Sequence, residues 1–135
     1  MKYIVYTDGG SRGNPGPSGC GVFLSSADGQ VIERRYKSLG IATNNIAEYT
    51  AVLLGISRAI ELGATEIELY ADSKLVIEQL SGNYKIKNAQ LKEIFLDIQE
   101  RIGKWGGHIS FTHIPREQNK EADRLSNVAM DSGMR

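Results

Sequence analysis

Four acidic residues of this chain stand at positions from which they could form one site. Asp8 and Asp72 each end a short run of β-forming residues, Glu48 lies near the start of a long helical pattern, and Asp123 lies in the last one. Clustered carboxylates repel one another by roughly 4 kcal/mol per pair at about 4 Å and an effective dielectric of about 20, so cations must hold such a cluster. The expected ligand is a hard divalent ion, Mg²⁺ or Mn²⁺. Two such ions, about 4 Å apart, would suit phosphoryl transfer.

The stretch around Asp8 presents its carboxylate beside a polar loop. Residues 3–8 have the composition of a buried strand, and residues 9–19 are rich in the glycine, proline, serine and asparagine that favour turns. We therefore expect Asp8 at the carboxyl end of a strand, next to backbone N–H groups that can face a ligand. A hairpin turn opened by Asp8 and Gly9 is the alternative for this stretch taken alone.

Length and composition limit the class of protein. A chain of 135 residues is about one domain, and we expect residues 1–135 to fold as one. The 16 basic and 16 acidic side chains cancel, so a polyanion must be held by local contacts rather than by net charge.

Cys20 is the single cysteine and is expected to be a buried thiol. No apolar run approaches the ~20 residues that span a bilayer, so we expect a cytoplasmic protein with no membrane partner. We also expect a monomer.

The first half of the chain predicts a meander followed by a helix. Residues 21–25 and 31–36 flank Asp28-Gly29, a strong hairpin signal, so the first three strands should pair antiparallel, with the first at an edge or in the middle of the sheet. Apolar residues then recur at helical spacing over residues 45–62. Asn45 would be the N-cap, and Glu48 would complete a capping box; this is the alternative role for Glu48.

The second half predicts parallel strands. Residues 67–72 form a strand, a short helix runs from Ser73 to Gly82, a further helix covers residues 91–102, and residues 108–114 form a strand ended by Pro115. The last helix should begin near residue 118 or 119. Alternation of strand and helix indicates an α/β fold in which Asp8 and Asp72 meet at one sheet edge, where such sheets bind ligands. Capping the following helix is the alternative for Asp72.

Four segments, taken together, resemble the successive motifs of type 1 ribonuclease H. They are Thr7-Asp8-Gly9-Gly10 with residues 13–17, Thr43-Asn44-Asn45-Ile46-Ala47-Glu48, Tyr70-Ala71-Asp72-Ser73, and Asn119-Lys120-Glu121-Ala122-Asp123. The match follows the family order over nearly the whole chain. It implies a ribonuclease H-like fold with a mixed five-stranded sheet, three antiparallel strands and then two parallel ones, flanked by helices. It also implies an endonuclease that cuts the RNA strand of RNA–DNA hybrids and leaves 3′-hydroxyl and 5′-phosphate ends.

The resemblance assigns roles to the acidic residues and to one histidine. Two Mg²⁺ or Mn²⁺ ions would be bound, with Asp8 bridging them, Asp123 completing the site of the ion that activates water, and Glu48 and Asp72 holding the second ion. His113, ten residues before Asp123, resembles a mobile histidine that moves protons or helps product release. A histidine packed at a strand end is the alternative for His113.

The resemblance also suggests where a hybrid would bind. Asparagines would touch the minor groove or the sugar-phosphate backbone, a threonine would bind a DNA-strand phosphate, and loop amides would read the RNA 2′-hydroxyl. Turn and cap roles are compatible with these contacts. The residues concerned are Gly9, Gly10, Ser11, Arg12, Asn14, Thr43, Asn44, Asn45 and Ser73. Many bacterial members carry a long basic protrusion where this chain has only residues 83–89, which puts substrate affinity in doubt.

Two other functions remain open at the level of sequence. One is a binding module that kept the fold and lost the chemistry, although a mere binder has no physical reason to keep four carboxylates. The other is a nuclease of the same fold that acts on double-stranded RNA or on DNA. Cleavage of a panel of duplexes separates these alternatives.

Overall fold

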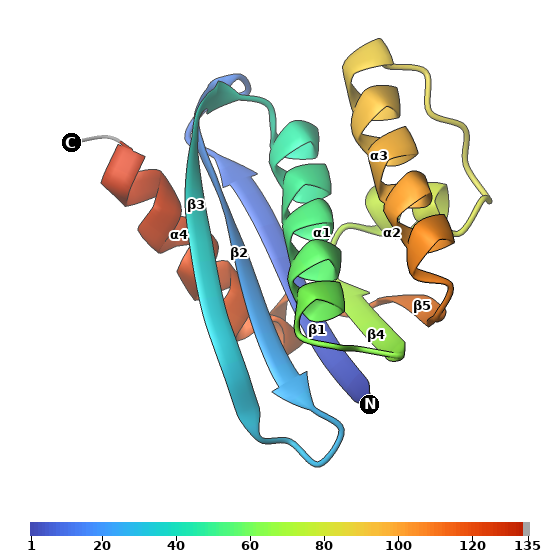
Figure 1. The fold of residues 1–135 in the computed structure, drawn as a ribbon. Coiled ribbons are helices and arrows are strands. Elements are labelled where there is room, and N and C mark those ends of the chain that lie inside the picture. Colours follow the sequence, from blue (N-terminus) through green and yellow to red (C-terminus); the bar gives the residue numbers. More distant parts are fainter. Residues whose placement is uncertain (134–135) are drawn as a thin grey trace.

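A mixed five-stranded sheet forms the centre of the molecule. The computed structural model describes residues 1–133, and its elements are β1 (Lys2–Ser11), β2 (Gly16–Ser26), β3 (Val31–Ala42), α1 (Asn44–Glu61), β4 (Glu66–Ala71), α2 (Lys74–Leu80), α3 (Ala89–Trp105), β5 (His108–His113), a 3₁₀ turn (Arg116–Gln118) and α4 (Lys120–Gly133). The sheet order is β3-β2-β1-β4-β5 (Figure 1). Strands β1 to β3 pair antiparallel, and β1, β4 and β5 run parallel. The α/β fold class and the two groups of strands are confirmed, and β1 is the central strand.

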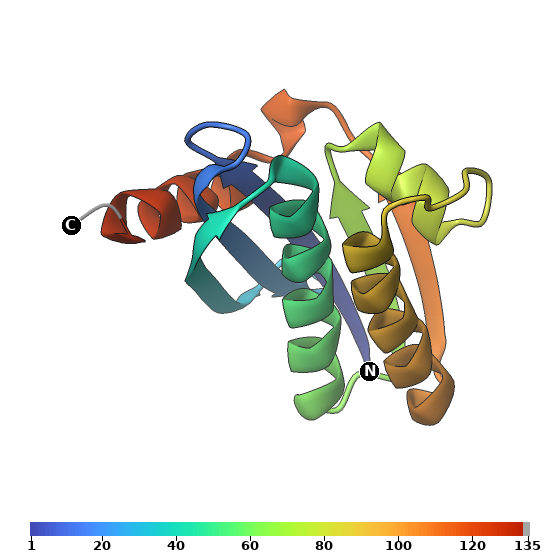
Figure 2. The same ribbon diagram turned by 90° about the horizontal axis from the view of Figure 1, so that it is seen from above.

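Helices cover both faces of this sheet. Helices α1 and α3 lie on one face, and α4 lies on the other against β1, β2 and β3 (Figures 1 and 2). The face under α1 holds the apolar core, because alternate strand residues such as Val5, Leu24 and Leu69 are fully buried against Ile56 and its neighbours. Within residues 1–133, none of the helices combines the length and the apolar character needed to cross a membrane.

Strand β1 continues past Asp8, which corrects the predicted loop at residues 9–19. Its parallel pairing with β4 ends at Thr7, opposite Ala71, but its antiparallel pairing with β2 continues to Ser11. Residues 12–15 alone form the turn. Gly9 serves close packing here, because a Cβ at this position would lie 2.2 Å from the backbone carbon of Ala47 in α1. The β2–β3 hairpin at Asp28-Gly29 is confirmed, with the Ser26 N–H donating to the Gln30 carbonyl at 2.8 Å.

The caps of α1 and α2 decide two of the alternatives. Thr43, rather than Asn45, is the N-cap of α1, and its hydroxyl accepts from the Ile46 N–H at 3.3 Å. Glu48 therefore lies in the second turn, and the capping-box prediction is wrong. Ser73 caps α2 by accepting from the Val76 N–H at 3.3 Å, so Asp72 does not cap this helix. Neither Glu48 nor Asp72 therefore caps a helix, and both carboxylates are available as ligands.

Candidate active site

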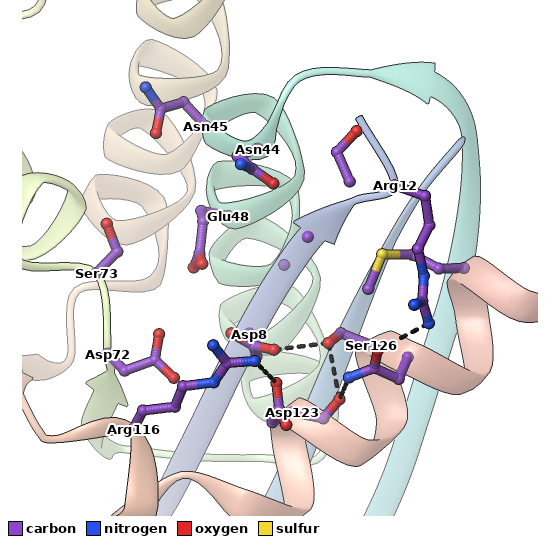
Figure 3. Close-up of a pocket in the computed structure, with 15 residues that line it drawn as sticks. Asp8, Arg12, Asn44, Asn45, Glu48, Asp72, Ser73, Arg116, Asp123 and Ser126 are labelled. Carbon is purple, nitrogen blue, oxygen red and sulfur yellow. Dashed lines mark hydrogen bonds and ion pairs between the residues drawn. The ribbon is translucent and has the colours of Figure 1, made fainter. Parts of the chain in front are cut away.

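Three of the predicted carboxylates meet where β4 ends beside β1. Asp8, Glu48 and Asp72 each offer an oxygen, and these oxygens lie within 4.8 Å of one another. Asp8 comes from β1, Asp72 directly follows β4, and Glu48 comes from α1 above the same sheet edge (Figure 3). Since β4 stops one residue before Asp72, the sheet opens here and α1 can bring Glu48 beside the two strand ends.

Two carboxylates of the cluster, Asp8 and Glu48, are buried, and burial favours their protonated forms. Asp8 is 6% exposed and Glu48 is 8% exposed. Burial raises the pKa of Asp8 to about 7, and the charges of Asp72 and Asp123 add to this, while a hydrogen bond from Ser126 opposes it. Burial, followed by the charges of Asp8 and Asp72, also raises the pKa of Glu48 well above its ordinary value. Without a cation, Asp8 and Glu48 therefore bind protons more readily than ordinary carboxyl groups do.

The donor set fits a divalent cation. Oε2 of Glu48 is buried and has no hydrogen-bond partner among residues 1–133. Orphaned buried carboxylate oxygens are costly, and a hard cation satisfies such an atom while it cancels the repulsion between neighbours. Three carboxylates at this spacing are oxygen ligands of the kind that Mg²⁺ and Mn²⁺ prefer.

Asp123 faces the same pocket but lies outside this group of three. It is in the first turn of α4, and its Oδ1 accepts from the Arg116 guanidinium at 3.3 Å (Figure 3). It raises the pKa of Asp8 through its charge, so the two side chains interact. The structure thus brings Asp8, Glu48 and Asp72 together, with Asp123 next to them and paired to a cation of the chain itself.

A polar pocket of about 500 Å³ surrounds the cluster. Seven of the nine predicted substrate-binding residues line it: Gly9, Gly10, Ser11, Arg12, Asn44, Asn45 and Ser73. Asn14 and Thr43 are outside the lining; Oδ1 of Asn14 accepts from the Asn44 N–H at 3.1 Å, and Thr43 caps α1. His113 ends β5, is exposed, and is also outside the lining.

Sequence reasoning missed several residues that hold the site together. The Ser126 hydroxyl donates to Oδ2 of Asp8 at 2.6 Å. The amide of Asn119 donates to the Thr7 carbonyl at 2.9 Å and to Oδ2 of Asp72 at 3.1 Å. Further lining residues that were missed are Arg116, Asn127 and Met130. A signal for Ser126 was present, because a residue three positions after Asp123 shares its helix face.

Comparison with known proteins found a matching family model and similar chains. Residues 6–129 match the family model described as reverse transcriptase-like. The chain is 43% identical over 133 residues to the bifunctional protein Rv2228c of Mycobacterium tuberculosis, covering 98% of this chain but only 36% of that protein. The solved N-terminal RNase H domain of Rv2228c superposes with a TM-score of 0.95 at 41% identity, covering 99% of this chain and 96% of that one.

Two further relatives match over nearly their whole length. Ribonuclease H of Ruthia magnifica is 34% identical over 144 residues, covering 96% of each chain. LC11-RNase H1, solved in complex with an RNA/DNA hybrid, has a TM-score of 0.94 at 38% identity, covering 98% of this chain and 99% of that one. With this fold, this order of motifs and these similarities, the chain belongs to the ribonuclease H family.

Proposed function

We propose that this chain is an endonuclease that hydrolyses the RNA strand of RNA–DNA hybrids and leaves 3′-hydroxyl and 5′-phosphate ends. The observation that carries the proposal is the group of Asp8, Glu48 and Asp72, whose oxygens lie within 4.8 Å of one another in an open polar pocket. Relatives named ribonuclease H, and a similar structure solved with an RNA/DNA hybrid, support it.

We propose further that the four carboxylates hold two Mg²⁺ or Mn²⁺ ions. Asp8 would be shared, Asp123 would complete one site, and Glu48 and Asp72 would complete the other. Bound divalent cations supply Lewis-acid stabilisation of the charge that develops on a phosphodiester during hydrolysis. The chain contributes the fixed positions of these ligands, since Asn119 holds Asp72 and Ser126 holds Asp8. For Asp123 to act as a ligand, it would use Oδ2, or Oδ1 would exchange the Arg116 guanidinium for the cation.

The pocket walls would position the nucleic acid. Its lining includes Gly9, Gly10, Ser11 and Arg12, and Asn44 and Asn45 at the start of α1. In our proposal these groups contact the sugar-phosphate backbone and the 2′-hydroxyl in the shallow minor groove of the hybrid. Asn14 and Thr43 would take part through the loop and the helix start that they hold. We propose that the protein acts as a monomer in the cytoplasm.

A cleavage panel tests the function. End-labelled RNA–DNA hybrid, RNA duplex, DNA duplex and single-stranded RNA are incubated with the protein in Mg²⁺, in Mn²⁺ and in chelator. We expect metal-dependent cutting of the RNA in the hybrid, with products that carry a 5′-phosphate and a free 3′-hydroxyl. Binding to the hybrid without cutting in either metal would indicate a binding module. Preferred cutting of RNA duplex or DNA duplex would assign another substrate to the same site.

Replacing His113 by alanine is expected to lower kcat while the enzyme still cuts. His113 is exposed at the end of β5, where its imidazole can carry protons. A positioned proton carrier raises the reaction rate by roughly 10²- to 10⁴-fold, and water can replace part of this effect. His108, exposed at the other end of β5, provides the matched control, and His108→Ala should leave kcat unchanged. Single-turnover rates between pH 6 and 9 make the comparison. Equal rates for the His113 variant and wild type would make this histidine structural.

Binding of the hybrid is expected to be weak and to depend little on salt. Between α2 and the end of α3 the cations are Lys85, Lys87, Lys92, Arg101 and Lys104, against Glu93, Asp97 and Glu100. Arg101 and Lys104 are already paired, at 3.0 Å with Asp97 and at 2.9 Å with Glu100. Few phosphates can be neutralised there, and each missing contact lowers the salt slope of log K by roughly 0.9 on a duplex.

This expectation is checked by titrating a short hybrid between 50 and 200 mM salt, with Ca²⁺ in place of Mg²⁺ to suppress cutting. A lysine-rich insertion after Asn83 should lower KM and steepen the slope with kcat nearly unchanged, whereas an insertion of the same length made of serine and glycine should change neither. A wild-type slope equivalent to six or more phosphate contacts would reveal a basic surface elsewhere.

A further inference from the structure

We propose that Ser126 is a positioning residue that fixes the carboxylate of Asp8 for cation binding. The inference rests on the proposed function, because it assigns Ser126 a part in the same metal-binding group. The resemblance to the family did not point to this residue, which stands in α4 on the side of β1 away from Glu48. Its evidence is the geometry of one buried hydrogen bond and the packing that creates it.

The hydrogen bond is direct and shielded from water. The Ser126 hydroxyl donates to Oδ2 of Asp8 at 2.6 Å (Figure 3). Ser126 is 1% exposed, and Asp8 is 6% exposed. A hydroxyl bound to a carboxylate at this distance is a short, charge-assisted hydrogen bond, which is about twice as strong as a neutral one. With one oxygen held, the plane of the Asp8 carboxylate is fixed relative to β1.

The Ser126 hydroxyl also lies within hydrogen-bond distance of a second acceptor, and that acceptor already has a hydrogen bond from another residue. Ser126 Oγ lies 2.9 Å from the carbonyl oxygen of Asp123 in the preceding turn of α4. The same carbonyl accepts from the side-chain amide of Asn127 at 2.9 Å. A hydroxyl has only one proton to donate, and a carboxylate is a stronger acceptor than a carbonyl that is already bonded. The proton of Ser126 therefore goes to Asp8.

A glycine opposite Asp8 lets α4 come close enough for this contact. In the β1–β2 register Asp8 pairs with Gly21. A Cβ at Gly21 would lie 2.6 Å from the backbone nitrogen of Ser126, so any larger residue would displace α4. The backbone of α4 therefore lies directly over the strand position beside Asp8. Glu48 and Asp72 each place an oxygen within 4.8 Å of an oxygen of Asp8, and ionised carboxylates at that spacing repel one another. The Ser126 hydrogen bond holds the ionised Asp8 carboxylate in place against that repulsion.

Calorimetric titration with Mn²⁺, without nucleic acid, tests the inference on the full chain. We expect Ser126→Ala to weaken Mn²⁺ binding by roughly 10- to 100-fold, the usual effect of removing a group that orients a metal ligand. Ser126→Cys keeps a similar volume but has a weak donor, so it should resemble the alanine variant. Ser25 is also buried, at 6% exposed, but lies at the far end of β2, and Ser25→Ala should bind Mn²⁺ like wild type.

Thermal unfolding in chelator shows whether each variant folds. If Ser126→Ala does not fold, the result for Ser126→Cys decides the test. Wild-type affinity for Mn²⁺ in either folded Ser126 variant overturns the positioning role, since it shows that the hydrogen bond is not needed. Loss of affinity in the Ser25 variant as well would show a general effect of buried serine and also overturns it. The titration needs no cleavage, so a protein that binds Mn²⁺ without cutting the hybrid contradicts the proposed function and leaves the test of Ser126 valid.

Discussion

Asp8→Asn is expected to abolish hydrolysis of the hybrid. Asp8 lies close to Glu48 and Asp72 and is held by the hydrogen bond from Ser126. An amide removes the negative charge that attracts the cations, and the loss of several kcal/mol of transition-state stabilisation corresponds to a rate that falls roughly 10³-fold or more. The measurement is single-turnover cleavage of labelled hybrid in saturating Mg²⁺.

A matched control comes from the β2–β3 turn. Asp28 is exposed there, and Asp28→Asn makes the same chemical change at a residue outside the pocket that surrounds the cluster. We expect its rate to equal that of wild type. Cleavage by the Asp8 variant within about tenfold of the wild-type rate would contradict the role of the cluster in catalysis.

Asp8→Asn should also stabilise the metal-free protein against unfolding, but only at higher pH. The pKa of Asp8 rises to about 7 in the folded state, first through burial. Between its ordinary value and about 7 the folded state holds a proton that the unfolded state releases, so stability falls as pH rises through this window. Asparagine carries no such proton and should raise the free energy of unfolding by about 2–4 kcal/mol at pH 8. At pH 4 the gain should vanish.

Chemical denaturation in chelator at pH 4, 6 and 8 measures this difference. Saturating Mg²⁺ should reverse its sign at pH 8, because the wild type then gains binding energy that the variant lacks. A gain that stays the same from pH 4 to pH 8 would show that Asp8 does not bind a proton in the folded state over this range.

Gly9→Ala is expected to destabilise the fold by about 3 kcal/mol. The new methyl group would lie 2.2 Å from the backbone carbon of Ala47 and 2.4 Å from the backbone nitrogen of Glu48. Backbone atoms cannot move aside as a flexible side chain does, so β1 and the start of α1 must separate. That movement carries Glu48 away from Asp8, and any folded variant should also lose most of its cleavage activity. Chemical denaturation and single-turnover cleavage measure the two effects.

Gly103 provides a control for the change from glycine to alanine. It lies in α3, and a Cβ there meets no atom within 4 Å. Gly103→Ala should therefore stabilise the protein slightly, by about 0.5 kcal/mol, because alanine loses less backbone entropy in a helix. If the variants at Gly9 and Gly103 had equal stability, the close contact between β1 and α1 would not be rigid.

Local sequence patterns predicted the elements and part of the site. The period-two and helical patterns located five strands and four helices, and the order of strand and helix placed Asp8 and Asp72 on neighbouring parallel strands. These inferences succeed because side-chain periodicity is a property of the strand or helix itself. The end of β1 and the cap of α1 were wrong. Strand β1 is longer than predicted because Gly9 to Ser11 pair with β2, which the local composition does not reveal. Helix α1 begins earlier because the Thr43 hydroxyl accepts from the Ile46 N–H.

Only the tertiary structure decided how the carboxylates are held. The pairing of Asp123 with Arg116, the bond from Asn119 to Asp72 and the bond from Ser126 to Asp8 join positions that no local pattern connects. Ser126 and Asp8 are 118 residues apart in the sequence. Their contact exists because Gly21 leaves room for the backbone of α4 against the sheet. The sequence thus determines which residues can bind cations, and the docking of α4 decides how one of them is oriented.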